Sequence, residues 1–278
     1  MKEPATVEII ETRGDVDRTA RLQGKIEKGF FTAELETALR EKRIDFAVHS
    51  LKDLPTRLPE DLEVAAVLER AAPNDRLLVR REAMSAGKLP LISGAQVGAS
   101  SLRREALLKL FGPLAVPKLL RGNVPTRVKK LAAGEYDAIL LAAAGLDRLA
   151  LDLKELRAVD LNPKVWIPAP GQGAVAVQCR RGDQRALEAF ASLHHAATAR
   201  AVHLERELLR VFEGGCSSPF GAFAEGDAVW VGAEHDGRWK SIRRAAPSTV
   251  DERFCVDALD ELRKRGSDGE ESWLYRAR

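Results

Sequence analysis

This chain of 278 residues has few cysteines, little excess charge and no long apolar run. Its three cysteines, Cys179, Cys216 and Cys255, show no short spacing, which argues against a disulfide framework and against a zinc site. His194-His195 predicts no metal site either, because no nearby cysteine or second pair completes a ligand set. So sparse a set suits a reducing compartment, and we expect a cytoplasmic protein.

The balance of charge and the absence of long apolar runs exclude two further classes of partner. The 44 basic and 41 acidic residues leave a net charge of only +3, far from the basic excess of a nucleic-acid binder. The chain contains no run of about 18 apolar residues, so we expect no membrane span. Its first residues lack the apolar core of a signal peptide. We expect neither nucleic acid nor membrane as a partner, whereas a local basic cluster could still bind a small anion.

The residues that are present predict a globular chain of two or three domains. Up to about residue 195, apolar strand-like runs alternate with amphipathic helical stretches, which predicts an α/β fold with mostly parallel sheets. From about residue 196, a long helix, shorter strands and a last helix predict a small α+β domain. The expected strands cover 5–10, 45–50, 62–68, 77–79, 96–98, 116–120, 138–143, 174–179 and 229–233, and the expected helices cover 31–40, 101–111, 124–133, 196–212 and 256–265.

Cations and hydroxyls follow several of the expected strands. Ligands of an open parallel sheet bind beyond the carboxyl ends of its strands, so these side chains are expected to converge. Their convergence predicts a site for a ligand with several carboxylates. The residues concerned are Lys52, Asp53, Ser101, Arg103, Arg104, Arg121, Arg127 and Arg148.

The segment Ser100-Ser101-Leu102-Arg103-Arg104 offers hydroxyls and free backbone N–H groups at a helix start, where the helix dipole favours an anion. Its two arginines can bind carboxylates in a bidentate manner. The alternative is an ordinary serine N-cap followed by solvated arginines.

Asp53 is a carboxylate among cations, which could act as acid or base or stabilise a developing cation. Its alternative is a surface Lys52–Asp53 pair. His49 lies inside an apolar strand and is expected to be a packed, hydrogen-bonded histidine.

Cys216 follows two glycines that leave its thiol open, which favours a covalent attachment point. By contrast, Cys179 ends an apolar strand and is expected to be inert.

Six segments resemble the porphobilinogen deaminase family and follow one another in that family's order over nearly the whole chain. They are HSLKDLPTRLP at 49–59, GASSLRR at 98–104, LRGNVPTR at 120–127, GEYDAILLAAAGLDRL at 134–149, IPAPGQGA at 167–174 and EGGCSSPFGA at 213–222.

The resemblance implies two α/β domains like those of periplasmic binding proteins and a third, α+β domain that presents a cysteine. The expected domains are 1–68 with 172–191, then 74–167, then 196–278. The chain is expected to be a monomer.

The resemblance also implies an activity and roles for residues. The family joins four porphobilinogen units, with loss of ammonia, on a dipyrromethane cofactor bound through a thioether. This would make Cys216 the attachment point and Asp53 the catalytic carboxylate. The other implied residues are Ser50, Lys52, Ser101, Arg103 and Arg104 for the cofactor, Arg121, Arg127 and Arg148 for the substrate, and Lys28 and Phe31 in a lid.

The chain departs from the family pattern at its start. The family begins with a strand that ends in an Arg-x-Ser motif and continues into a helix, whereas Met1 falls just before the expected second strand. Losing a central strand removes buried apolar side chains and backbone partners. We therefore expect a destabilised first domain and little deaminase activity.

Three other hypotheses remain open from the sequence. One is a non-catalytic protein of the same fold that binds a small anion, although a bare cleft needs no exposed Cys216. Another is a catalytically impaired remnant. The third is a different transferase with a cysteine nucleophile, which would need a base near Cys216.

Overall fold

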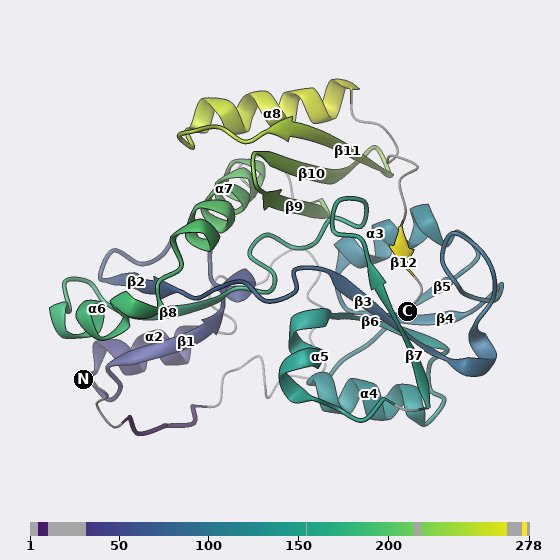
Figure 1. Ribbon diagram of the computed structural model, residues 1–278, viewed down its shortest axis with the longest axis horizontal. Helices are drawn as coiled ribbons and strands as arrows, with labels where there is room; N and C mark the ends of the chain where they lie inside the picture. The colour runs from purple at the N-terminus through teal and green to yellow at the C-terminus, as the bar shows by residue number, and fades with distance from the viewer. Residues whose placement is uncertain (1–4, 11–31, 154, 214–217, 266–273, 277–278) are drawn as a thin grey trace.

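The computed structural model describes residues 5–10, 32–153, 155–213, 218–265 and 274–276. These residues form three sheets with helices packed on them, as Figure 1 shows. The elements in chain order are α2 (Ala33–Arg40), β1 (Phe46–Ser50), η1 (Leu51–Asp53), β2 (Leu62–Val67), β3 (Asp75–Arg80), η2 (Arg81–Ala83), β4 (Gln96–Ala99), α3 (Leu102–Phe111), β5 (Val116–Leu119), α4 (Val124–Ala132), β6 (Ala138–Ala142), α5 (Ala143–Leu149), β7 (Leu156–Leu161), β8 (Val175–Arg180), α6 (Gln184–Phe190), η3 (Ala191–Leu193), α7 (Ala196–Glu213), β9 (Phe220–Glu225), β10 (Ala228–His235), β11 (Arg238–Ala245), α8 (Glu252–Arg265) and β12 (Tyr275–Arg276).

The first sheet has the order β1-β8-β2, with both outer strands antiparallel to β8. The central strand β8 is the most buried of the three, and its residues 176–179 are all buried. Strand β1 alternates instead, with Ala47 and His49 buried and Val48 60% exposed, as expected of an edge strand with one covered face. Leu39 of α2 packs on Ala47 and closes that face.

The second sheet has the order β12-β7-β3-β6-β4-β5. Strand β6 has the continuous apolar sequence AILLA and is buried along most of its length, as a central strand covered on two faces should be. The third sheet is the antiparallel meander β11-β10-β9, covered by α7 and α8. Trp166 and Ile167 lie in one apolar core with Phe223 and Trp239, so the second and third sheets share packing.

The expectation of mostly parallel sheets is wrong. Only β4–β5 and β4–β6 are parallel, and every other described pairing is antiparallel. The parallel pairs are those whose strands are linked through α3 and α4 as strand–helix–strand units. Strands β3 and β8 arrive instead by crossovers from another sheet, so no helical connection imposes their direction.

The strand expected at residues 5–10 is also wrong. These residues belong to no strand, and Val7 and Ile9 are both 89% exposed. A strand needs a partner for its backbone groups and a core for its apolar face. Strand β1 pairs with β8 alone among the described strands, so residues 5–10 receive neither.

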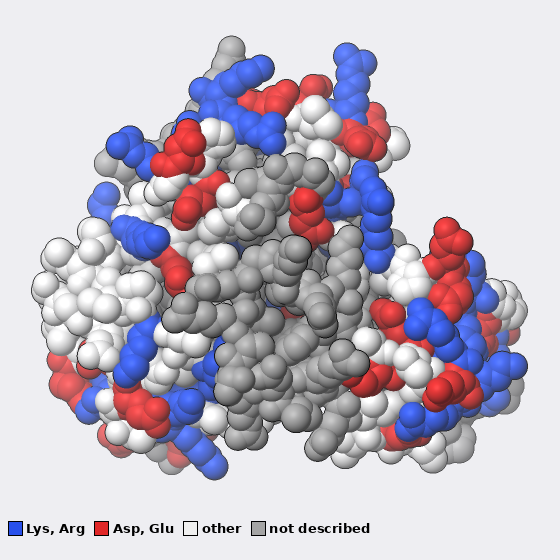
Figure 2. Space-filling model, turned by 180° about the vertical axis from the view of Figure 1, so that it is seen from behind, with Lys and Arg blue, Asp and Glu red and all other residues white. Residues whose placement is uncertain are grey.

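The remaining expected elements are present, with bounds that shift by a few residues. The α/β class with a small α+β third unit is confirmed, although the ranges of β7, α5, α6, β9, β11 and β12 were not predicted. No described helix is both long enough and apolar enough to cross a membrane. Acidic and basic side chains are interspersed over the face in Figure 2.

Candidate functional site

A short turn at the end of β1 carries the first group of predicted site residues. Leu51 and Leu54 anchor the turn, with 3% and 4% exposure, and leave Lys52 and Asp53 between them. Pro55 follows directly and has no backbone N–H with which to extend the helix. The two apolar anchors therefore hold a charged pair at the strand end, where a ligand of the sheet would lie.

The charges around this turn come from the second sheet. Asp53 is open to solvent, yet the surrounding protein raises the pKa of its carboxyl, and the charges of Lys52 and Arg104 oppose that rise. Burial likewise lowers the pKa of Lys52, which the negative charges of Asp53 and Asp75 oppose and the charges of Arg104 and Arg103 reinforce. Lys52 and Asp53 therefore lie within electrostatic range of Arg104, on the first turn of α3.

Arg103 and Arg104 are not solvated, as the alternative hypothesis would require. They are 5% and 6% exposed, and both bind the fully buried Asp75. Arg103 Nη2 lies 2.9 Å from Asp75 Oδ2, and Arg104 Nη2 lies 2.7 Å from Asp75 Oδ1. Trp166 Nε1 and Gln172 Nε2 donate to the same carboxylate at 2.9 and 3.0 Å. Asp75 thus fixes both arginines.

The environment of Asp75 keeps it charged. Burial alone would raise its pKa, but the charges of Arg103 and Arg104 and the hydrogen bonds of Arg104 and Gln172 hold the pKa well below its usual range. Asp75 was not among the site residues predicted from the sequence. The available signal was a carboxylate at the start of the apolar strand Asp75–Arg80, since a buried charge is rare without a partner.

Both arginines keep donors that no described group satisfies. Arg103 Nη1 donates to Ile167 O at 2.9 Å and Arg104 Nη1 to Leu140 O at 3.0 Å. Their Nε atoms are buried and have no hydrogen-bond partner. A buried donor without an acceptor costs free energy. The Nε groups of Arg103 and Arg104 therefore suit a ligand that provides acceptor atoms.

Arg121 and Arg127 extend the cluster of cations. Arg127 donates to Gly122 O at 2.6 Å and to Ser100 Oγ at 3.0 Å. Burial, together with the nearby charges of Arg104 and Arg121, lowers the pKa of Arg127 to about 10. Gly122 is required here, because its φ is +111° and a Cβ would lie 2.9 Å from the Thr126 side chain. The chain thus brings four arginines within electrostatic range of one another.

The predicted serines have hydroxyls that make no capping bond. Ser101 is the N-cap residue of α3 and Ser50 precedes η1, and neither side chain caps its helix. Ser101 also lies at the positive end of the helix dipole. Both hydroxyls can therefore serve a ligand.

Arg148 reaches a neighbouring segment. It lies in α5 and donates from Nη2 to Gly173 O at 3.1 Å. Gln172, next to Gly173, binds Asp75, so Arg148 and the Asp75 cluster hold the same stretch of chain.

Cys216, Lys28 and Phe31 lie outside the described residues. The helix that precedes Cys216, α7, ends at Glu213, whose Oε2 accepts from Thr56 Oγ1 at 3.1 Å. The described end of α7 therefore lies beside the segment that carries Asp53.

The two described cysteines are free and buried. Burial raises the pKa of Cys179 and raises that of Cys255 to about 11. A thiol is a weak nucleophile until it loses its proton. Neither is therefore suited to covalent chemistry, in line with the expectation for Cys179.

The histidines have structural partners. His49 Nε2 lies 3.0 Å from Gln178 Oε1, and burial lowers the pKa of His49 although that contact opposes the change. His194 Nδ1 accepts from Val67 N at 3.3 Å, and His195 Nδ1 lies 2.8 Å from Thr198 Oγ1. The described residues contain no group of three His, Cys, Asp or Glu side chains able to hold a metal ion.

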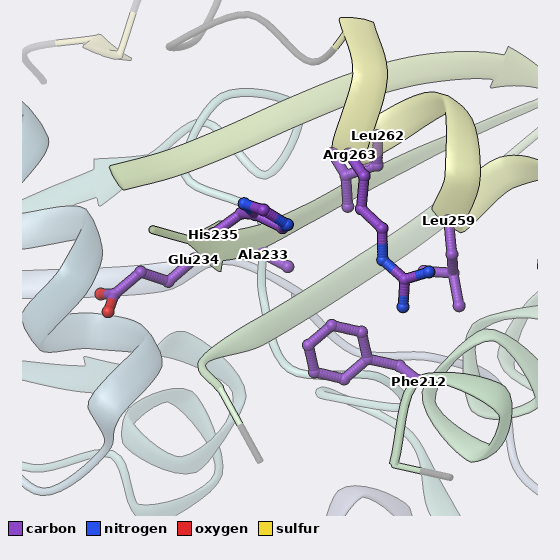
Figure 3. Close-up of a pocket in the computed structure, with 7 residues that line it drawn as sticks. All are labelled: Phe212, Ala233, Glu234, His235, Leu259, Leu262 and Arg263. Carbon is purple, nitrogen blue, oxygen red and sulfur yellow. The ribbon is translucent and has the colours of Figure 1, made fainter. Parts of the chain in front are cut away.

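A cavity of about 190 Å³ lies in the third unit, between the end of α7, β10 and α8 (Figure 3). Phe212, Leu259 and Leu262 give it an apolar wall, and His235 and Arg263 give it polar groups. None of the clustered cations lines it, so it is separate from the candidate site.

Comparisons with known proteins show the family of the chain. A family profile described as "Porphobilinogen deaminase, dipyromethane cofactor binding domain" matches residues 1–188, and "Porphobilinogen deaminase, C-terminal domain" matches residues 199–233. A solved structure of the amino acid ABC transporter substrate-binding protein AbpA from Streptococcus pneumoniae covers 57% of this chain and 64% of its own, at 15% identity and a TM-score of 0.35.

Curated relatives match over most of both chains. Porphobilinogen deaminase from Gloeobacter violaceus is 46% identical over 270 residues, which are 94% of this chain and 82% of the relative. Those from Roseiflexus sp. and Deinococcus radiodurans are 45% and 41% identical, over 94% and 92% of this chain and 86% and 83% of theirs. A carboxylate turn beside a cluster of arginines, the matching profiles and these relatives together lead to one conclusion: the chain belongs to the porphobilinogen deaminase family.

Proposed function

We propose that this chain polymerises four porphobilinogen units into the linear tetrapyrrole hydroxymethylbilane, with one ammonia released for each unit. The observation that carries the proposal is the placing of Lys52 and Arg104 within electrostatic range of Asp53, with the buried Arg103 and the partly buried Arg127 near Arg104. It occurs in a chain whose first 188 residues match the family's cofactor-binding domain. Neither the profiles nor the relatives favour an impaired or purely binding protein.

The cations suit the chemistry of the ligands. Each pyrrole carries an acetate and a propionate, so a growing chain is a polyanion. The buried Nε atoms of Arg103 and Arg104 lack acceptors that such carboxylates could provide, and the residues present therefore fit a dipyrromethane. When bound, the cofactor supplies the pyrrole position to which the first unit is added. We assign Ser50, Lys52, Ser101, Arg103 and Arg104 to the cofactor and Arg121, Arg127 and Arg148 to the substrate.

Asp53 is the catalytic carboxylate in this proposal. Loss of ammonia from porphobilinogen leaves a cationic pyrrole, and a carboxylate held beside it stabilises the positive charge as it forms. The raised pKa of Asp53 also suits proton transfer, because a carboxyl with a pKa nearer neutrality is a better acid and base. The final product is released by water.

Cys216 is the proposed point of attachment of the cofactor. Cys179 and Cys255 are buried thiols with raised pKa values, and the helix leading to Cys216 lies beside the segment after Asp53. Intact-mass spectrometry should show a dipyrromethane adduct that Cys216→Ser abolishes and Cys179→Ser retains. An adduct on Cys179 or Cys255 would contradict the assignment.

Activity itself is tested by incubating the holoprotein with porphobilinogen and following substrate consumption, ammonia release and the linear tetrapyrrole. Four ammonia molecules per tetrapyrrole are expected. Binding of porphobilinogen without ammonia release would instead support a binding protein.

Further parts of the proposal concern organisation. We propose domains at 1–68 with 172–191, at 74–167 and at 196–278, each built around one of the three sheets, although β12 at the end of the last range joins the second sheet. Lys28 and Phe31 belong to a lid in this proposal. The protein is a cytoplasmic monomer, which suits its free cysteines. Light scattering at several concentrations tests the monomer, and a mass that rises with concentration would contradict it.

A further inference from the structure

Arg206, in the middle of α7, contacts the turn that carries Lys52 and Asp53. Its Nη1 donates to the carbonyl oxygens of Leu51 and Leu54, both at 3.0 Å, and its Nη2 donates to Pro55 O at 2.6 Å. One guanidinium therefore binds three carbonyls on both sides of the charged pair. The neighbouring Glu205 binds Arg70 instead, so Arg206 is not needed for that ion pair.

The turn has little else to satisfy these carbonyls. Its own backbone bond, Leu54 N to Leu51 O, is 3.2 Å long, and Pro55 cannot donate another. Leu51 and Leu54 are buried, so their side chains keep water from much of this backbone. Carbonyls left without a donor in such a place cost free energy, and a planar guanidinium suits several at once.

The opposite side of the turn is also held closely. Leu51 N donates to Ala174 O at 3.0 Å. A Cβ on Gly171 would lie 3.3 Å from Leu51 Cγ and 3.4 Å from Lys52 N, so the backbone at Gly171 packs directly on the turn. Gly171 N in turn donates to Glu205 Oε2 at 2.7 Å. The turn thus lies between Arg206 on one side and the 171–174 segment on the other, and α7 contacts both.

We propose that Arg206 is a positioning residue for the Lys52–Asp53 turn, holding its backbone so that Asp53 faces the arginines of α3. The catalytic part of this inference rests on the proposed function. The helix α7, which belongs to the third unit, then also orients the carboxylate of Asp53 in the first unit. Arg206 itself makes no contact with the reacting atoms in this proposal.

The test compares Arg206→Ala and Arg206→Lys with Arg210→Ala in the full-length holoprotein. Arg210 lies one turn further along α7, and its partners among the described residues are Glu207 and Glu252, so its loss controls for a general effect on the helix. Hydrogen exchange of the amides in residues 50–56 should be about tenfold faster or more in Arg206→Ala, because three hydrogen bonds are lost. It should be unchanged in Arg210→Ala.

Kinetics and rescue separate positioning from a loss of stability. Turnover by Arg206→Ala should fall on the order of 10–100-fold with KM nearly unchanged, because a misplaced catalytic group costs rate rather than binding. Millimolar guanidinium should restore both protection and turnover in this variant alone. Arg206→Lys, which keeps the charge without the planar fork, should give an intermediate result and remains informative if the alanine variant does not fold.

Unchanged exchange at residues 50–56 in the Arg206 variants would overturn the proposal, as would loss of turnover equal to that of Arg210→Ala. If the parent protein does not consume porphobilinogen, the proposed function fails, and the exchange and rescue measurements still decide the role of Arg206.

Discussion

Asp53 and Asp75 lie in the same cluster of cations, yet their pKa values shift in opposite directions. The loss of hydration next to the surrounding protein raises the pKa of Asp53, whose side chain still reaches solvent, more than the charges of Lys52 and Arg104 lower it. For Asp75, the deeper of the two, burial is overcome by Arg103, Arg104 and their hydrogen bonds. No hydrogen bond to the Asp53 carboxyl occurs within the described part of the chain, whereas four donors reach Asp75.

The opposite pKa shifts of Asp53 and Asp75 show that the hydrogen-bond and ion-pair partners of a carboxylate, rather than its depth in the protein, decide whether it is available for chemistry. Asp75 has its lone pairs occupied and serves to fix two arginines. Asp53 is held through the backbone of its turn, so its oxygens stay free to meet a ligand. Substitutions of either carboxylate, or of the arginines of the candidate site, test this difference.

The largest expected effect is on stability, from Asp75→Ala. Two buried arginines would lose their common anion, which should lower the free energy of unfolding by about 3–5 kcal/mol. Asp147→Ala is the matched control, because Asp147 also binds an arginine but is 51% exposed, and it should cost no more than about 1 kcal/mol. Urea unfolding measures both. Equal losses in the free energy of unfolding of the two variants would show that burial does not make the Asp75 ion pairs more important than an exposed ion pair.

Asp53→Asn should act on rate instead. Removing the charge that stabilises a cationic transition state should lower turnover by about 10²–10³-fold, while the free energy of unfolding is unchanged or higher. Glu60→Gln, an exposed carboxyl seven positions along, should leave turnover intact. Porphobilinogen consumption and urea unfolding give the two readouts. Full turnover in Asp53→Asn would remove Asp53 from the mechanism.

The arginines should divide by role. Arg104→Leu should impair seating of the cofactor and so lower the fraction of holoprotein, since Arg104 lies against Asp75 and Asp53. Arg148→Leu should load the cofactor normally and accumulate early intermediates several-fold, because substrate carboxylates lose a partner. Intact-mass spectrometry counts the intermediates in each. The same set of intermediates in both variants would refute the assignment of Arg104 to the cofactor and Arg148 to the substrate.

The smallest expected effect is a difference in pH dependence. The pKa of Asp75 is lower in the folded than in the unfolded protein, so its contribution to stability is present above its ordinary value of 3.8 and is lost as pH falls below it. The pKa of Asp53 is raised, so ionising Asp53 costs stability as pH rises through its folded pKa.

Acidification from pH 7 towards 3 should therefore shrink the stability deficit of Asp75→Ala and also shrink any stability gain of Asp53→Asn. Urea titrations of the three proteins across this range check the two signs. A gain for Asp53→Asn that grows on acidification would contradict the raised pKa.

Local residue patterns were enough to predict most of the elements and which charged side chains come near one another. The alternation of β4, α3, β5, α4 and β6 carries its own periodicity, and connections through helices oblige these strands to be parallel. The placing of Lys52 beside Arg103 and Arg104 followed from one rule, that ligands lie beyond strand ends. Such inferences need only neighbours in sequence and a common sheet edge.

Only the tertiary structure decided which groups are partners. Residues 5–10 have the composition of a strand but no partner among the described strands, and pairing cannot be read from composition. Asp75 meets Trp166 and Gln172, which lie some ninety residues away in the chain. Arg206 reaches Leu51 over a longer separation, 155 residues. The sequence by itself determined the kinds of groups available at the site, and folding determined which of them are neutralised and which remain free for a ligand.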